Sequence, residues 1–351
     1  MTEITPFLKQ LISVPGLSGY EAPVRDLIEQ EWRLLCDEIH LSRLGNLQGL
    51  RRGAGPEPRP SLLIAAHMDA IGMLVSGQVG EFLRLAAIGG IDPRILPGQL
   101  VTVHGKRELP GVIVQPPLHM LPEEAQELSP RLEYLLVDVG LLPAEVRRLV
   151  QLGDLVSFAQ PPLEMGDFLA GHSLDNRSSI AALTICLREL QNRHTSWDVW
   201  AVATVQEEES LAGALTSAFQ LHPSLAVTID TTYGTGPGSP NHLSFPLDKG
   251  PTLAWGPNIH PGLHRTFKEI ADRLKIPYQF EPIAADSGTD AMVIQIAAEG
   301  IPTMLLEIPL RYMHSPVEMV SLNDVRRTGL LIAEFAAGLG ETFLERLSLD
   351  D

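Results

Sequence analysis

Seven acidic or histidine side chains stand at or near the ends of apolar segments, where a fold could gather them. They are His67, Asp69, Asp175, Glu207, Glu208, Asp230 and His314. The apolar runs LLIAA, VWAVATV, SLAVTI and MLLEI come before all of them except Asp175, which precedes a helical pattern. If these runs are parallel strands, their carboxyl ends meet at one sheet edge, the usual place for a site in an open α/β sheet.

These residue types indicate chemistry with divalent metal ions. Two imidazoles and several carboxylates without a thiolate suit Zn²⁺, Co²⁺ or Mn²⁺. One carboxylate shared between two ions would give a two-metal site, with the ions about 3.5–4 Å apart and a bridging hydroxide. Glu207 and Glu208 are adjacent past a strand end, so their side chains point in different directions. One can bind metal while the other serves as a general base.

Structural roles stay open for several of the polar residues. Asp230 could cap a turn before two threonines. Glu209 could be solvated or begin a helix, where acidic residues are favoured. Asp290, in the segment SGTDA, could cap or begin the helix that follows. His172 lies three residues before Asp175 and could support it without binding metal.

Length and composition describe a globular protein with more than one small domain. The 351 residues are 44% hydrophobic and 20% charged, which allows a sizeable core. A net charge of −17 argues against nucleic acid as a partner, because phosphate binding needs clustered Lys and Arg. We expect no membrane segment and no signal peptide. Cys36 and Cys186 are expected to be free thiols, so we predict a cytoplasmic protein.

Strand and helix patterns alternate outside one internal region, which indicates α/β architecture with a largely parallel sheet. Helical patterns cover residues 22–39, 177–191, 289–300 and 321–347, and strand patterns cover 59–66, 197–205, 224–229 and 301–308. Residues 71–162 instead show short alternating segments separated by Gly and Pro, typical of a small β domain. We therefore predict an α/β domain of residues 1–70 and 163–351, with a β domain of residues 71–162 inserted into it.

The chain resembles the M42 metallopeptidases, the family of glutamyl and TET-type (tetrahedral) aminopeptidases, some of which carry an endoglucanase label. The similar segments span nearly the whole chain and include PGLSGYE, AHMDAIGMLV, IGGIDPRILPGQLVTVHG, LDNR, VQEEES, GTDA and RYMHSPVEMV. The resemblance implies a three-layer metallopeptidase domain with an inserted, β-barrel-like dimerisation domain. It also implies a homo-oligomer, with dimers assembling into a dodecamer.

The resemblance further implies two divalent ions per subunit, Zn²⁺ or Co²⁺ and alternatively Mn²⁺. His67, Asp175 and Asp230 would hold one ion. Asp175, Glu208 and His314 would hold the other, with Asp175 bridging the two.

Glu207 would be the general base of a dinuclear aminopeptidase, which uses a metal-bridged water to remove N-terminal residues from peptides. Asp69 would orient His67 and fix its tautomer. Two alternatives stay open, a dinuclear hydrolase of another amide, such as a deacylase, and a non-catalytic metal-binding scaffold on the same fold. Glycosidic-bond cleavage fits less well, because two histidines and a shared carboxylate suit metal hydrolysis better than a carboxylate pair.

Two positions depart from the usual pattern of the family. Ala70 stands where HMDEIG has a glutamate, and Asn176 stands where LDDR has its second aspartate. Neither position is an implied ligand, so metal binding is expected to survive. Ala70 removes an acidic group near His67, which bears on substrate preference and metal affinity. The resemblance also implies a cis peptide bond between Asp175 and Asn176.

Overall fold

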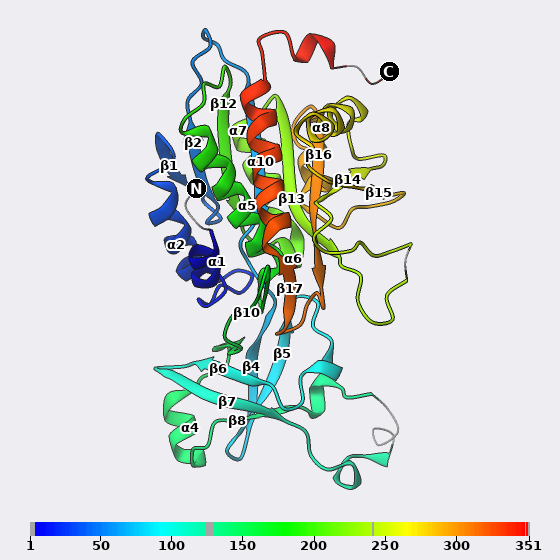
Figure 1. Cartoon of the computed structure of the whole chain (residues 1–351). Helices are drawn as coiled ribbons and strands as arrows, with labels where there is room; N and C mark the ends of the chain where they lie inside the picture. The colour runs from blue at the N-terminus through cyan, green and yellow to red at the C-terminus, as the bar shows by residue number, and fades with distance from the viewer. Residues whose placement is uncertain (1–3, 124–128, 241, 348, 350–351) are drawn as a thin grey trace.

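The computed structural model describes residues 4–123, 129–240, 242–347 and 349. It combines a layered α/β part with a β-barrel, which lies below the α/β part in Figure 1. The mixed α/β architecture with a mainly parallel central sheet confirms the predicted fold class. The barrel strands lie between Gly72 and Phe158. The domain boundaries at residues 70–71 and 162–163 stay a prediction.

The elements of the α/β part come from both sides of the barrel in the sequence. Its strands are β1 (Glu38–Leu41), β2 (Leu47–Arg51), β3 (Ser61–His67), β10 (Leu163–Met165), β11 (Phe168–Gly171), β12 (Asp198–Thr204), β13 (Leu225–Tyr233), β14 (Thr252–Trp255), β15 (Gln279–Pro282), β16 (Thr303–Arg311) and β17 (Glu318–Ser321). Its helices are α1 (Thr5–Leu11), α2 (Ala22–Trp32), α5 (Leu174–Leu190), α6 (Glu207–Ser210), α7 (Ala212–Leu221), α8 (Pro261–Leu274), α9 (Asp290–Gln295) and α10 (Leu322–Gly338), and a 3₁₀ turn spans Leu344–Arg346.

The central strands of the sheet are parallel and buried on both faces. They run in the order β12, β3, β13 and β16, and helices lie on each side of them. Along β3, Leu62 and Ile64 pack in the core under α5 and α10, whereas Leu63 and Ala65 pack in a second core under α7 and α9. Side chains alternate between the faces of a strand, so a continuous apolar run fills both cores.

The sheet is antiparallel toward its edges, where the sequence patterns were less informative. β2 pairs antiparallel with β12 and with β1, and β16, β17, β11 and β10 pair antiparallel in that order. The helix predicted over residues 22–39 is wrong beyond Trp32, because Glu38–Leu41 form β1 and pair with β2. Apolar residues such as Leu35 and Ile39 fit a helical period, but backbone pairing with a second strand decides the outcome.

Two other helices are shorter than predicted. The helix expected over residues 321–347 ends at Gly338, and a separate 3₁₀ turn follows. Gly338 and Gly340 weaken the helix there, because glycine loses more conformational freedom in a helix than other residues do. The helix expected over residues 289–300 ends at Gln295, and Gly300 closes the following turn with a positive φ of 97°.

The barrel closes within the described residues in the order β4, β5, β8, β7, β6 and β9. Its elements are β4 (Gly72–Val79), β5 (Phe82–Ile88), β6 (Leu100–His104), β7 (Glu108–Val114), β8 (Leu136–Asp138), β9 (Leu155–Phe158), α4 (Pro143–Leu149) and 3₁₀ turns at Pro93–Ile95, Leu118–Met120 and Leu132–Tyr134. Its interior is a hydrophobic core of its own, with Met73, Val103 and Val156 fully buried.

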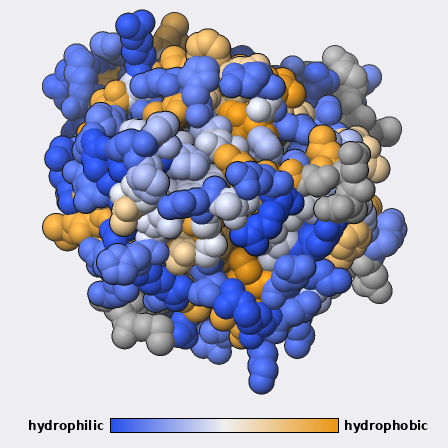
Figure 2. Space-filling model, turned by 90° about the horizontal axis from the view of Figure 1, so that it is seen from above, coloured by the Kyte–Doolittle hydropathy of each residue, from blue (hydrophilic) through white to orange (hydrophobic). Residues whose placement is uncertain are grey.

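The surface seen from above in Figure 2 is mainly hydrophilic, with separate hydrophobic patches. In the described part of the chain, no helix is both long enough and apolar enough to cross a membrane. Both cysteines are free; Cys186 is buried, and Cys36 is partly buried. Burial raises the pKa of Cys186 well above its ordinary value, so this thiol is unreactive and fills the core.

Candidate metal centre

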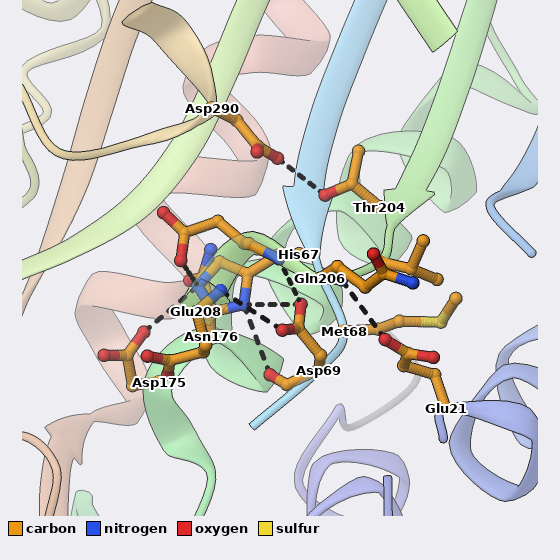
Figure 3. A network of polar contacts seen from close by, with 12 residues as sticks. Glu21, His67, Met68, Asp69, Asp175, Asn176, Thr204, Gln206, Glu208 and Asp290 are labelled. Carbon is orange, nitrogen blue, oxygen red and sulfur yellow. Dashed lines mark hydrogen bonds and ion pairs between the residues drawn. The ribbon is translucent and has the colours of Figure 1, made fainter. Parts of the chain in front are cut away.

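The predicted residues meet at the carboxyl edge of the central sheet. Figure 3 shows His67, Asp69, Asp175 and Glu208 among them. His67 is the last residue of β3, and Asp230 lies on the neighbouring strand β13. Glu207 and Glu208 begin α6, the short turn that follows β12. Each of these four side chains is almost fully buried, with at most 9% of it exposed. Parallel strands therefore deliver them to one place, as the sequence predicts.

Asp175 lies between the two predicted histidines. Its Oδ1 is 3.3 Å from Nε2 of His67, and its Oδ2 is 3.5 Å from Nε2 of His314. Nε2 of His67 is also 3.6 Å from Oδ1 of Asp230, and Nε2 of His314 is 3.4 Å from Oε2 of Glu208. Each imidazole thus faces one oxygen of Asp175 and at least one further carboxylate. The five side chains form two sets that share Asp175.

Glu207 lies beside the first of these sets. Its Oε2 is 3.7 Å from Nε2 of His67. Ligand atoms of His67, Glu207 and Asp230 lie within 4.8 Å of one another, and so do those of His67, Asp175 and Glu208. The two adjacent glutamates therefore enter different groups, although the chemistry of their side chains is the same.

Backbone carbonyls orient both imidazoles. Nδ1 of His67 is 3.2 Å from the carbonyl oxygen of Asp69, and Nδ1 of His314 is 2.9 Å from that of Gly90. A carbonyl can only accept, so Nδ1 carries the hydrogen in each ring and Nε2 faces the carboxylates. This is the tautomer that a metal ligand needs. Gly90 belongs to the loop after β5, so the inserted segment contributes directly to the site.

The carboxylate of Asp69 holds the backbone of the glutamate pair. Its two oxygens accept hydrogen bonds from the N–H groups of Glu207, at 3.0 Å, and Glu208, at 3.2 Å, and Oδ1 lies 3.5 Å from Nδ1 of His67. Glu21 makes a similar contact one residue earlier, accepting the N–H of Gln206 at 3.2 Å. The sequence did not assign Glu21, although it lies in the segment PGLSGYE, because that contact joins residues 185 positions apart.

Two buried groups fix the position of Asp175. The peptide bond between Asp175 and Asn176 is cis, which confirms that prediction, and Nδ2 of Asn176 donates to the carbonyl of Ile229 at 2.9 Å. The carboxylate of Glu318 accepts the N–H of Asp175 at 3.1 Å and that of His314 at 2.9 Å. Glu318 was missed from the sequence. Its only signal is its place in SPVEMV, four residues after His314.

Most pKa values in the cluster are shifted upward, whereas that of Asp175 is lowered, because its contacts with His314 and His67 outweigh burial. Burial, reinforced by nearby carboxylates, raises the pKa of Glu207 to about 10 and that of Glu208 to about 8. The hydrogen bond to Asp175 raises the pKa of His314 to about 9. Burial lowers the pKa of His67, but Glu207 and its other carboxylate neighbours outweigh it and raise this pKa well above its ordinary value. The upward shifts favour bound protons, whose place divalent ions can take.

The donor set fits such ions. Oε1 of Glu208 is buried and has no hydrogen-bond partner among the described residues. This oxygen is therefore available to a ligand inside the cluster. Imidazole nitrogens and carboxylate oxygens, without a thiolate, are the ligands of Zn²⁺, Co²⁺ and Mn²⁺ sites. Several carboxyl groups can be buried together only when bound protons or cations neutralise their charge.

Other residues considered from the sequence have structural contacts. Oε1 of Glu209, in α6, accepts the N–H of Gly89 at 2.6 Å, so this glutamate links α6 to the loop after β5. Asp290 begins α9, as expected, and also accepts from Thr204 at 2.6 Å. His172 contacts Ser173 at 2.8 Å, and burial lowers its pKa to about 3, so it is neutral.

A cavity of about 660 Å³ opens onto the cluster. The side chains that line it include the five predicted ligands, Glu207 and Glu209. They also include Thr232, Glu281, Ile283 and Glu307. A volume of this size accommodates one or a few amino-acid residues next to the cluster.

Comparison with known proteins identifies the family. The model of the M42 glutamyl aminopeptidase family matches residues 45–331. A lysyl aminopeptidase of Pyrococcus furiosus is 34% identical over 331 residues, which cover 92% of this chain and 93% of that protein.

Solved structures agree with this match. An aminopeptidase from the archaeon Desulfurococcus kamchatkensis has a TM-score of 0.90 at 32% identity, with 98% of this chain and 97% of that chain covered. The TET1 peptidase of Pyrococcus horikoshii, which assembles into a tetrahedron or a large octahedral shell, has a TM-score of 0.83 at 30% identity, with 96% and 100% covered. The chain therefore belongs to the M42 glutamyl aminopeptidase family, whose members are metal-dependent enzymes that hydrolyse peptide bonds.

Proposed function

We propose that the protein is a dinuclear aminopeptidase that removes N-terminal residues from peptides. The observation that carries the proposal is the position of Asp175, whose two carboxylate oxygens face His67 on one side and His314 on the other. One ion would be held by His67, Asp175 and Asp230, and the other by Asp175, Glu208 and His314. Zn²⁺ or Co²⁺ suit these ligands best, with Mn²⁺ as an alternative. When bound, such ions activate water and polarise a carbonyl.

The remaining residues would position and move protons. Glu207 would accept the proton of the attacking water and pass it to the leaving amine. Its raised pKa of about 10 belongs to the cluster without cations, and bound divalent charge would lower it toward the range of a working base. Asp69 would keep the backbone of Glu207 and Glu208 in place through its two hydrogen bonds.

A pair of variants tests the two glutamate roles against each other. Glu207→Gln should keep about two ions per subunit but lose about 10²- to 10⁴-fold in kcat, as removal of a general base does. Glu208→Gln should bind fewer ions. Metal content is measured by mass spectrometry, and activity with aminoacyl p-nitroanilides after adding back Zn²⁺, Co²⁺ or Mn²⁺. Near-normal turnover by Glu207→Gln would refute its role, and no turnover by the wild type with any metal would refute the proposed reaction.

We also propose a homo-oligomer in which dimers assemble into a dodecamer, with the barrel as the dimerisation surface. Large assemblies are described for related TET1 peptidases, including a dodecamer. Support within this chain comes from exposed leucines on the barrel, because Leu100, Leu142 and Leu152 are 63%, 72% and 73% exposed. Sedimentation of wild type and Leu142→Glu tests the assembly. The cytoplasmic location stays a prediction that two free cysteines support.

A further inference from the structure

Two carboxylates lie in the cavity beside the metal centre without belonging to it. Glu307 is on β16, where it is the register partner of Asp230 on β13. Glu281 is on β15, which pairs with β14, the strand next to β16. Both line the cavity. Acidic side chains therefore continue along the sheet from Asp230 on β13 to Glu307 on β16 and, beyond β14, to Glu281 on β15.

The two carboxylates differ in how they are held. Glu281 accepts hydrogen bonds from Thr232, at 2.7 Å, and Thr252, at 2.5 Å, one on each oxygen. Glu307 is only 4% exposed, and its Oε2 is buried and has no hydrogen-bond partner among the described residues. An acceptor that is buried next to a second carboxylate and left unpaired costs free energy unless a donor arrives.

Among the described residues, no cationic side chain reaches Oε2 of Glu307. No Lys or Arg is among the described side chains that line this cavity, and its two histidines face the metal cluster. Ile283 and Met313 line the same cavity and offer apolar contact to a methylene chain. A long side chain with a cationic end matches both features.

We infer that Glu281 and Glu307 form a side-chain pocket that selects peptides with a basic N-terminal residue, Lys or Arg. The inference rests on the proposed aminopeptidase function, which brings the N-terminal residue next to the metal centre. The ammonium or guanidinium group donates to Oε2 of Glu307 and pairs with the Glu281 carboxylate. An N-terminal Glu would add a third carboxylate to the pocket and should be the poorest substrate.

Binding without turnover tests this pocket directly. Calorimetry on the metal-loaded protein compares free lysine with free norleucine, neither of which has a bond for the enzyme to cleave. Norleucine has the same α-ammonium and α-carboxylate groups and a similar chain but no cationic end. Lysine should bind at least about tenfold more tightly, as expected for a hydrogen bond to a buried charged group. Equal affinity for the two amino acids would overturn the inference.

Variants separate this pocket from a site for the α-ammonium group. Glu307→Gln and Glu281→Gln should each bring the ratio of lysine to norleucine affinity toward one, whereas the exposed control Glu341→Gln should leave it unchanged. An equal loss for both amino acids would place the α-ammonium group at these glutamates and overturn the inference. Thermal unfolding shows whether the variants are folded, and the wild-type comparison stands without them. Turnover of leucyl p-nitroanilide reports separately on the proposed reaction.

Discussion

Gly90→Ala tests whether the inserted barrel takes part in the metal centre. A Cβ at position 90 would lie 2.9 Å from Nδ1 and 3.1 Å from Cε1 of His314. Ordinary contacts of a Cβ begin near 3.4 Å. The imidazole of His314 therefore has to move by about half an ångström, the tolerance within which a catalytic group must be held. The backbone itself accepts alanine, because Gly90, unlike Gly89, is not among the glycines with positive φ.

The expected effect is selective for His314. Its hydrogen bond to the carbonyl of Gly90 is 2.9 Å long, so moving the ring weakens the contact that aims Nε2 at Asp175 and Glu208. Loss of a contact that orients a metal ligand typically costs about 10- to 100-fold in metal affinity or activity. We expect a loss of that size in the affinity for the second ion and in kcat, which is about 1.4–2.7 kcal/mol.

The assay measures metal affinity by chelator competition and activity with aminoacyl p-nitroanilides on the same preparations. Gly338→Ala is the matched control, since a Cβ there meets nothing within 4 Å. Neither variant should unfold at a lower temperature than the wild type, because the change at Gly90 affects one side chain of the site rather than a core. Gly338→Ala should even raise the unfolding temperature slightly, since alanine strengthens the end of α10. Wild-type metal affinity and kcat in Gly90→Ala would refute the view that this loop positions His314.

Three further predictions concern the same cluster. Asp69→Asn keeps one acceptor oxygen for two N–H donors, so it should lose one charge-assisted hydrogen bond, worth about 1.5–3 kcal/mol, and weaken metal binding at least tenfold by calorimetry. Metal affinity should rise with pH, because the pKa values of Glu208, about 8, and His314, about 9, are raised and both groups must lose protons when metal binds. Calorimetry near pH 7 in buffers of different ionisation enthalpy measures the protons released on metal binding. Metal binding without proton release would contradict this prediction. Since these folded-state pKa values are raised, the metal-free protein should lose thermal stability from about pH 5 to about pH 9, whereas an unchanged melting temperature would contradict the assigned shifts.

The central strands of the sheet could be predicted from the sequence, because a strand buried on both faces is recognisable from its own residues. The apolar runs that become β3, β12, β13 and β16 are continuous, as strands buried on both faces must be. The same reasoning could not find β1 and β2, whose partners are fixed by pairing rather than by pattern. It could not place the end of α2 either, since Leu35 and Ile39 continue the helical period after the helix stops.

The candidate site also has a part that the sequence predicts and a part that only the structure shows. The residues of the cluster could be predicted because all of them except Asp175 follow a strand that the pattern reveals. The contacts that orient them could not, because they join distant parts of the chain. His314 and Gly90 are 224 positions apart, and Glu318 and Asp175 are 143 apart. A backbone carbonyl also leaves no trace in the residue type, so the orienting role of Gly90 is visible only in the structure.

These distant contacts explain why an enclosed cluster of like charges stays ordered. Asp69 and Glu21 hold the backbone at residues 206–208, while Glu318 holds the N–H groups of Asp175 and His314. Each is a carboxylate that accepts backbone hydrogen bonds, so acidic residues position the acidic residues of the site. That arrangement adds further negative charge around the centre. The two metal ions proposed above would offset this charge, so they would stabilise the same geometry that the backbone contacts hold.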